Sequence, residues 1–222
     1  MKSNHRIKIA KTGTLSLACI ILSQAVCLAA TYYVATNGDD NNPGTELEPF
    51  QTFQKGMDSA GDGDTVFIKT GVYDLSGYSK DIDYKLSLIG EDKRSTVLRN
   101  GETITFHDSL TVKNLKFIDK YTYNPVFKPQ AREGETINGI YFENCVFDNV
   151  RRGIYTGKDS EGAITNVHIS NCEFLNMVGG TSVNAISIYV SSGLVSDKDP
   201  YMSCDVLKYP VYINIVLDHI HR

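Results

Sequence analysis

Three segments of the chain share one pattern of hydrophobic and polar positions. Residues 110–119, 140–149 and 167–176 each read apolar, any, apolar, any, Asn, apolar, any, Phe. A weaker copy begins at Leu86. The three copies are separated by 30 and then 27 residues, and such irregular spacing is typical of stacked coils joined by loops of variable length. The three copies align on Asn114, Asn144 and Asn171.

Within each copy, apolar side chains alternate as in a strand with one buried face. Ile140 and Phe142 point inward, and after Asn144 the phase shifts so that Cys145 and Phe147 point inward instead. This shift requires a corner at Asn144, and asparagine tolerates the left-handed backbone conformation of such a corner. The pattern therefore predicts an all-β fold, a right-handed parallel β-helix (a solenoid), with an antiparallel sandwich as the alternative.

Parallel stacking predicts columns of equivalent residues. Cys145 and Cys172 fall in one inward column, where strands about 4.8 Å apart make a disulfide geometrically conceivable. A buried, reduced pair that acts as two small hydrophobic side chains is the favoured interpretation. Phe117, Phe147 and Phe174 form a second inward column. Two columns face outward: one of Thr111, Tyr141 and His168, and one of Lys113, Glu143 and Ser170.

Residues 1–30 have the features of an export signal. A basic start without acidic residues precedes an apolar run from Leu15 to Leu28, and small residues follow. The run is too short and too interrupted for a confident membrane span. We therefore expect a signal peptide and a secreted protein, extracellular or periplasmic, with no membrane span after cleavage. An uncleaved anchor is the alternative.

The charge balance narrows the choice of partner. The chain has 22 basic and 26 acidic residues, and residues 1–30 hold four of the basic ones and none of the acidic ones, which leaves 18 and 26, a net charge of −8. An acidic surface argues against nucleic acid as a partner. An acidic polysaccharide would need a local basic patch or a bridging cation.

Residues 31–75 predict a strand, a short helix and a second strand. Thr52 can cap the helix, on which Phe53, Met57 and Ala60 share one face. The polar run 39–42 could be a calcium loop, but its spacing is not that of an EF-hand, and the turn that joins strand to helix needs the same residue types.

The run from Tyr32 to Asp74, "YYVATNGDDNNPGTELEPFQTFQKGMDSAGDGDTVFIKTGVYD", resembles the N-terminal cap of pectate-lyase-like secreted β-helix proteins. Many members of that family are polysaccharide lyases and glycoside hydrolases. The resemblance extends from about residue 31 to 190 and implies a helix that covers the open end of the coil. It implies little about activity, because unrelated chemistries share this scaffold.

Residues 76–222 are expected to form the coils. The last segment, 211–222, fits the beginning of another copy, with His219 in the place of the asparagine. We therefore expect a coil that is truncated at the C-terminus or covered by another subunit.

Candidate chemistry gathers around the second and third copies. A lyase needs a cation to neutralise a uronate carboxylate, a base for the C5 proton and an acid for the leaving oxygen. The resemblance implies calcium for the first role and Lys or Arg for the second. The candidate catalytic residues are Arg152, Lys158 and His168, with Tyr141, Arg151 and Tyr155 for substrate binding and Asp148 and Asp159 as calcium ligands.

Each candidate also has a structural interpretation, since Lys158 and Asp159 can simply belong to a polar loop and His168 to a solvated strand face. A hydrolase would need two carboxylates about 5–10 Å apart, for which Glu143, Asp148 and Glu173 are available. Polysaccharide lyase is the favoured function. The alternatives are a glycoside hydrolase, a non-catalytic glycan-binding or surface protein, and the structural N-terminal part of a larger enzyme.

Overall fold

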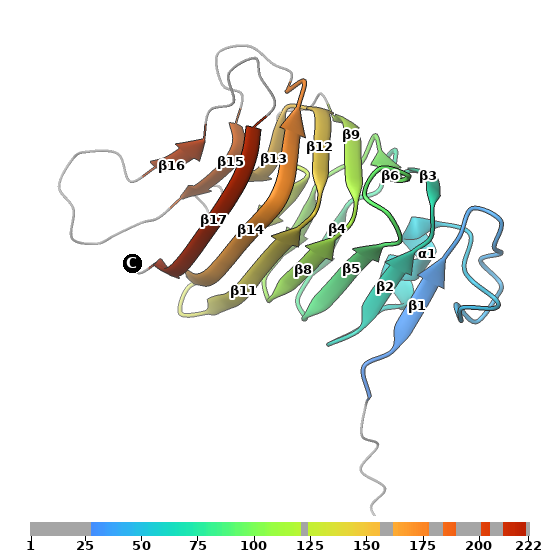
Figure 1. Cartoon of the computed structure of the whole chain (residues 1–222). Coiled ribbons are helices and arrows are strands. Elements are labelled where there is room, and N and C mark those ends of the chain that lie inside the picture. Colours follow the sequence, from blue (N-terminus) through green and yellow to red (C-terminus); the bar gives the residue numbers. More distant parts are fainter. Residues whose placement is uncertain are drawn as a thin grey trace, which may run out of the picture.

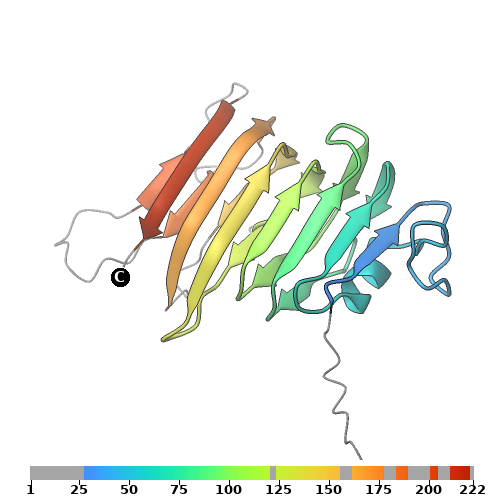
Figure 2. The same cartoon turned by 60° about the horizontal axis from the view of Figure 1, so that its bottom comes forward.

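The computed structural model describes residues 28–120, 124–155 and 162–177, and the backbone of residues 184–189, 201–204 and 211–220. In these residues the chain winds as a parallel β-helix, and strands from successive coils stack side by side (Figures 1 and 2). The prediction of a parallel β-helix with a short N-terminal helix is confirmed.

The coil has three faces. The first face consists of β1 (Thr31–Val34), β2 (Thr65–Ile68), β5 (Leu86–Gly90), β8 (Leu110–Lys113), β11 (Thr136–Glu143) and the first half of β14 (Ala163–Leu175). The second consists of β3 (Gly71–Asp74), β6 (Thr96–Arg99), β9 (Lys116–Lys120), β12 (Val146–Val150) and the second half of β14. The third consists of β4 (Lys80–Ile82), β7 (Ile104–Phe106), β10 (Phe127–Pro129), β13 (Arg152–Tyr155) and β15 (Asn184–Tyr189).

The corners between the first two faces are asparagines in the left-handed conformation. Their φ angles are 55° at Asn114, 57° at Asn144 and 52° at Asn171, as the sequence predicted. The Asn144 side-chain amide donates to the Asn114 side-chain oxygen at 2.7 Å, so the corners are also joined along the stack. The upstream copy differs: it has Gly90, where an added Cβ would lie 2.1 Å from the Asn114 carbonyl oxygen.

A second set of left-handed corners lies five residues further on, at the end of each copy, and the sequence analysis did not predict it. Asp119, Asn149 and Asn176 have φ angles of 60°, 56° and 45°. The Asn149 side-chain amide donates to Asp119 at 2.9 Å. These corners turn the chain out of the second face, so each copy contains one strand of that face and a bend on either side of it.

Like residues stack on like in the interior. The rings of Phe117 and Phe147 lie 5.1 Å apart, and those of Phe147 and Phe174 lie 4.9 Å apart and nearly parallel. Cys145 and Cys172 are buried free thiols in the neighbouring column. Burial, together with the adjacent Cys172, raises the pKa of Cys145 well above its usual value. This thiol therefore contributes to the core as a small hydrophobic group.

The helix α1 (Phe53–Ser59) lies at the N-terminal end of the coil against β1 and β2 (Figure 1). The Thr52 hydroxyl accepts from the Lys55 amide at 3.2 Å, which confirms the predicted cap. Phe53 and Met57 are fully buried. Gly56 permits this close packing, because an added Cβ would lie 2.6 Å from a methyl group of Val34.

The polar run 39–42 is occupied by turn contacts. The Asp40 carboxylate accepts from the Thr52 amide and hydroxyl and from the Gln51 amide, and Asp39 accepts from Asn41. These hydrogen bonds support the interpretation as a strand-to-helix turn.

At the other end of the stack the pairing changes direction. β17 (Val211–Ile220) pairs antiparallel with β14, and β16 (Tyr201–Cys204) pairs antiparallel with β15. The prediction that residues 211–222 resume the parallel repeat is therefore wrong. Its apolar alternation was compatible with either direction, because a strand has the same period of two in both.

Candidate functional site

Six outward side chains of the first face line a groove across β8, β11 and β14. The register pairs Tyr141 with Thr111 on one side and with His168 on the other, and it pairs Glu143 with Lys113 and Ser170 in the same way. Both predicted outward columns are thus confirmed. They border an open groove of about 320 Å³ on the surface of the coil.

Two of the predicted residues form an aromatic platform in this groove. The rings of Tyr141 and His168 are stacked, with centroids 5.1 Å apart and planes 12° from parallel. Tyr141 is 39% exposed, so part of its side chain is accessible to a ligand from solvent. Gly139 fixes the ring position, because its φ is +107° and an added Cβ would lie 2.8 Å from the Tyr141 ring.

An ion pair lies beside the platform. The Lys113 Nζ is 2.6 Å from a Glu143 carboxylate oxygen, and both side chains are almost half exposed. An ion pair this exposed contributes little to stability, because water solvates the separated charges almost as well. A ligand can therefore separate the pair at small cost, and the groove offers it an ammonium group, a carboxylate, a hydroxyl group and a ring surface.

Arg151, Arg152 and Tyr155 lie elsewhere on the coil. The Arg152 guanidinium is 4.6 Å from the centre of the Tyr155 ring, so the structure brings together this predicted pair. Both residues belong to β13 on the third face, whereas Tyr141 and His168 belong to the first. The predicted binding residues therefore divide into two sets on different faces. Lys158 and Asp159 lie outside the described residues.

Asp148, a predicted calcium ligand, has other partners in this structure. One carboxylate oxygen is 2.8 Å from Lys116 Nζ, and the other accepts from Asn176 at 2.8 Å. Burial alone would raise the pKa of Asp148, but these two contacts outweigh it and lower the pKa. A calcium ion at this carboxylate would have to displace Lys116.

Glu173, a possible hydrolase carboxylate, is held by two cations that the sequence analysis did not connect with it. Its side chain is 6% exposed, Lys93 Nζ lies 2.9 Å from Oε1, and Arg94 Nη2 donates to both oxygens at 2.9 Å. Burial would raise the pKa of Glu173, but the two cations lower it overall. A carboxylate that stays ionised in this way is unsuited to protonate a leaving group. We refer to Lys93, Arg94 and Glu173 as the buried triad.

A further polar group, which the sequence analysis missed, lies on the third face. Among the described residues, Asp81, Asp83 and His107 place one ligand atom each within 4.8 Å of one another. No shared motif marks them, because they lie in or directly after three-residue strands outside the repeated copies: Asp81 lies in β4, Asp83 follows β4 and His107 follows β7. The sequence signal is weak, since Asp83 and His107 each come directly after a buried apolar residue.

Comparisons with known proteins support the fold and leave the family open. No protein-family model matches this sequence. An uncharacterized protein of Bacillus subtilis (strain 168), YwoF, is 27% identical over 141 residues, which cover 62% of this chain and 28% of YwoF. The chain thus spans well under a third of the length of that relative.

Solved structures with a similar course of the chain are longer too. GH136 lacto-N-biosidase from Eubacterium ramulus matches with TM-scores of 0.53 (selenomethionine derivative) and 0.50 (native protein), 17% identity, and coverage of 66% of this chain and 34% of that one. A rhamnogalacturonan lyase gives a TM-score of 0.48 and 22% identity over 65% of this chain and 41% of its own. The GH136 likeness shows a shared fold. The resemblance to the pectate-lyase-like family remains a prediction.

Within the part of the chain that the structure describes, no helix has both the length and the apolar character to cross a membrane.

Proposed function

We propose that this chain belongs to a secreted, carbohydrate-active β-helix protein that binds a polysaccharide in the groove over β8, β11 and β14. The observation that carries the proposal is the stacked, half-open platform of Tyr141 and His168. Sugar rings present apolar faces, and these faces pack well on flat aromatic surfaces with polar groups around them. The fold likeness to a GH136 lacto-N-biosidase supports the same general class.

The favoured reaction is β-elimination on an acidic polysaccharide. A base takes the C5 proton, the electrons of that bond form the C4–C5 double bond, and the bond from C4 to the glycosidic oxygen breaks as an acid protonates that oxygen. For this reaction we assign three residues that line the groove: Lys113 to neutralise the uronate carboxylate, His168 to act as base and the Tyr141 hydroxyl to act as acid.

The hydrolase alternative has weaker support in this groove. Hydrolysis of a glycosidic bond needs two carboxylates. Among the residues that line the groove, Glu143 is the one carboxylate, whereas Asp148 and Glu173 are tied to cations. Non-catalytic glycan binding is the stronger alternative. Glu143 already neutralises the Lys113 ammonium, which the carboxylate of a uronate would need as its partner.

The predicted base Arg152 defines a second possible location, over β13, and Lys158 remains a candidate base from outside the described residues. Arginine suits bidentate contact with a carboxylate, and Arg152 is already oriented by Tyr155. Calcium, with Asp148 and Asp159 as ligands, remains a separate part of the proposal, because Asp148 belongs to β12 on the second face. The two locations are separable by mutation because they lie on different faces of the coil.

The test is incubation of the protein with pectate, alginate and chondroitin, with and without calcium, followed by the ultraviolet absorbance of unsaturated sugar ends. Tyr141→Ala is expected to weaken glycan binding about tenfold or more, and His168→Gln to abolish turnover while binding persists. Tyr155→Ala on β13 is the matched control and should change neither. Export is checked on the same material, since protein from the culture medium should begin near residue 30.

Each result discriminates between the versions. Loss of turnover in Tyr155→Ala and Arg152→Gln, but not in His168→Gln, would move the reaction to the third face. Retention of glycan without unsaturated products would identify a binding protein. If the protein neither binds nor cleaves any glycan in a broad panel, the proposal is overturned.

A further inference from the structure

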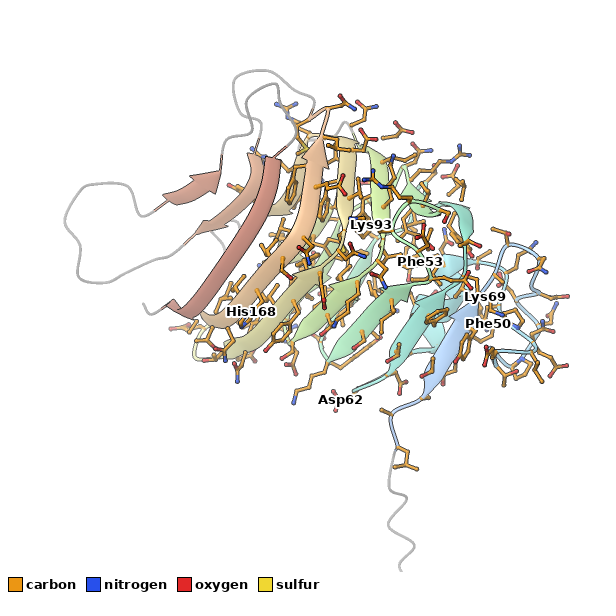
Figure 3. All side chains as sticks on the ribbon, viewed as in Figure 1. Phe50, Phe53, Asp62, Lys69, Lys93 and His168 are labelled. Carbon is orange, nitrogen blue, oxygen red and sulfur yellow. The ribbon has the colours of Figure 1, made fainter. Side chains whose placement is uncertain are left out.

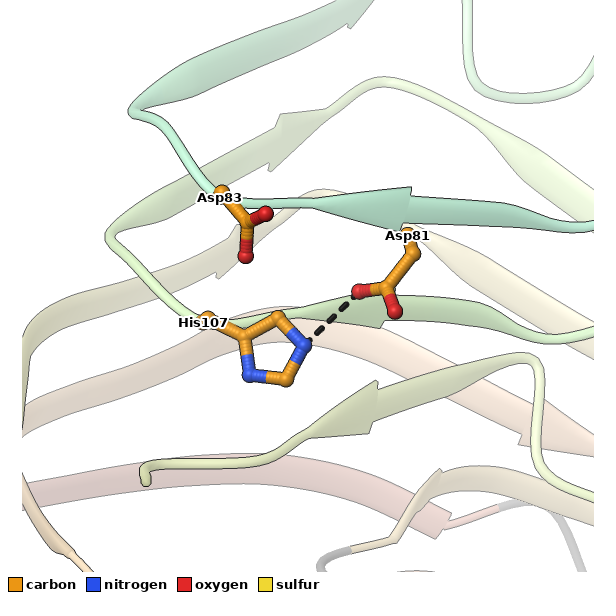
Figure 4. A group of neighbouring side chains, drawn as sticks. All are labelled: Asp81, Asp83 and His107. Atoms are coloured by element: carbon orange, nitrogen blue, oxygen red, sulfur yellow. Dashed lines mark hydrogen bonds and ion pairs between the residues drawn. The ribbon is translucent and has the colours of Figure 1, made fainter. Parts of the chain in front are cut away.

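Asp83 and His107 occupy equivalent positions in two successive coils on the third face. β4 and β7 pair in parallel with Ile82 opposite Phe106, so the next residues, Asp83 and His107, both emerge at the same end of the sheet. Asp81 lies two residues before Asp83 and therefore on the same side of β4. Figure 4 shows the two carboxylates and the imidazole converging from these two strands.

Both nitrogens of the His107 ring face hydrogen-bond acceptors. Nδ1 lies 2.6 Å from the backbone carbonyl oxygen of Gln130, which follows β10 in the next coil. Nε2 lies 2.7 Å from the Asp81 carboxylate, and the His107 side chain is only 8% exposed. The ring is thus almost completely buried and held at both nitrogens.

This arrangement limits where the protons can be. A carbonyl oxygen can only accept, so Nδ1 must carry a proton. A neutral ring then has a lone pair on Nε2, which would point at the negative oxygen of Asp81. A second proton on Nε2 would make this contact favourable, and so would a metal ion beside the two atoms that both of them bind.

The contact between His107 Nδ1 and the Gln130 carbonyl is of a kind found at metal-bound histidines. A histidine that binds metal through Nε2 commonly donates its Nδ1 proton to a backbone carbonyl, which fixes the orientation of the ring. The Gln130 carbonyl has this position. Asp81 and Asp83 supply two oxygens on the Nε2 side, and all three ligand atoms lie within 4.8 Å of one another.

A competing cation is already present beside the group. Arg132 contacts the Asp83 carboxylate, and its other terminal nitrogen lies 3.9 Å from Glu135. Arg132 therefore has a second carboxylate to turn to if an ion takes Asp83. Both aspartate side chains are well exposed, at 69% and 62%, so an ion can reach them directly from solvent.

We propose that Asp81, Asp83 and His107 bind a divalent first-row transition-metal ion of the zinc type. One imidazole nitrogen and two carboxylate oxygens are ligands that zinc accepts in a tetrahedral site, and three protein ligands leave one position for water or substrate. Calcium and magnesium prefer sites made entirely of oxygen ligands, so they bind here weakly. The site is separate from the groove over β8, β11 and β14.

The test is titration of the chelator-treated, purified protein with zinc chloride, followed by calorimetry, with manganese, calcium and magnesium as comparison ions. One tight zinc site is expected, and calcium at a hundredfold excess should not compete. His107→Gln and Asp83→Asn should each weaken zinc at least tenfold. His168→Gln, which removes a histidine from the other face, is the matched control and should leave the affinity unchanged.

Arg132→Gln sharpens the test, because removal of the competing cation should tighten zinc several-fold. Asp83 is exposed, so Asp83→Asn is expected to fold normally, and the folded state of each variant is checked by circular dichroism. Zinc binding that persists unchanged in folded Asp83→Asn and His107→Gln would overturn the proposal. So would the absence of a zinc site in the wild-type protein, in which case His107 only joins β4 to the residue after β10 through Asp81 and Gln130.

Discussion

The two halves of β14 lie beside charged groups in opposite surroundings: the exposed pair belongs to β8 and β11, whereas Glu173 belongs to β14 itself. Near His168 the Lys113–Glu143 pair is about half exposed, whereas five residues along the strand Glu173 is almost completely buried between Lys93 and Arg94. His168 and Lys93 mark these two regions in Figure 3. An exposed pair can exchange its partner for a ligand, but a buried carboxylate that loses its cations is left without solvation. The first half of the strand is thus suited to binding and the second to stability.

The buried triad also joins distant parts of the sequence. Lys93 and Arg94 lie in the loop between β5 and β6. Arg94 comes 79 residues before Glu173 in the sequence. Asp92 orders this loop by accepting from the amides of Arg94 and Ser95. The triad therefore links a loop of an early coil to β14, the last described strand of the first two faces that pairs in parallel, and it restrains the coils between them.

The largest effect is expected from Glu173→Gln. Loss of the negative charge leaves two cations facing each other at a buried site, and we expect about 2 kcal/mol of lost stability, below the range for a completely buried pair because Arg94 is partly exposed. Glu143→Gln removes a carboxylate of the same kind from the exposed pair and should cost less than about 0.5 kcal/mol. Denaturant unfolding measures both, and equal losses would contradict the contrast between the two halves.

A smaller effect, now on the binding half, is expected from Gly139→Ala. The added methyl group would press on the Tyr141 ring and tilt it away from His168. Glycan affinity should fall about tenfold, which corresponds to about 1.4 kcal/mol. Gly134→Ala is the matched control, because Gly134 also has a positive φ of 76° but an added Cβ has no neighbour within 4 Å. Similar losses of affinity in both variants would assign the effect to backbone strain alone.

The smallest expected effect is on the stability of the folded protein at acidic pH. The pKa of Glu173 is lower in the folded protein than its ordinary value of 4.5, because Lys93 and Arg94 outweigh the effect of burial. The stabilisation is therefore complete above the unfolded pKa and is lost as the pH falls through the folded pKa. From pH 5 to pH 4 the wild type should lose roughly 0.5 kcal/mol more than Glu173→Gln. Parallel stability curves for the two proteins over this range would argue against the triad.

The first two faces of the coil could be predicted well from the sequence, because their residues are repeated. Equivalents of Asn144 and Phe147 recur in each copy, so the alignment of the copies gives the position of each in the stack. The same repetition predicts that Tyr141 lies beside His168. The second corner also has a sequence signal, because Asp119, Asn149 and Asn176 each come five residues after a central asparagine.

The remaining contacts depend on features that do not repeat. The loop that carries Lys93 differs from those of the other coils, so nothing in its sequence indicates that it reaches Glu173. β4 and β7 have only three residues each, too few for a recognisable pattern, so the convergence of Asp81 and His107 required the register of the strands. The direction of β17 likewise depends on pairing and not on alternation.

The asparagine corners have a consequence for the ageing of the protein. In one pair of each corner column the residue of the later coil donates its side-chain amide and that of the earlier coil accepts: Asn144 donates to Asn114, and Asn149 donates to Asp119. Asn176, one coil further on, donates to Asp148 instead. Deamidation converts an amide into a carboxylate, which can accept but cannot donate. The accepting position tolerates this change, as the aspartate at position 119 illustrates. At Asn149 the same change would set a new carboxylate against that of Asp119, whereas at Asn144 the amide of Asn114 can turn to donate. The damage done by slow hydrolysis therefore depends on the position in the column at which it occurs.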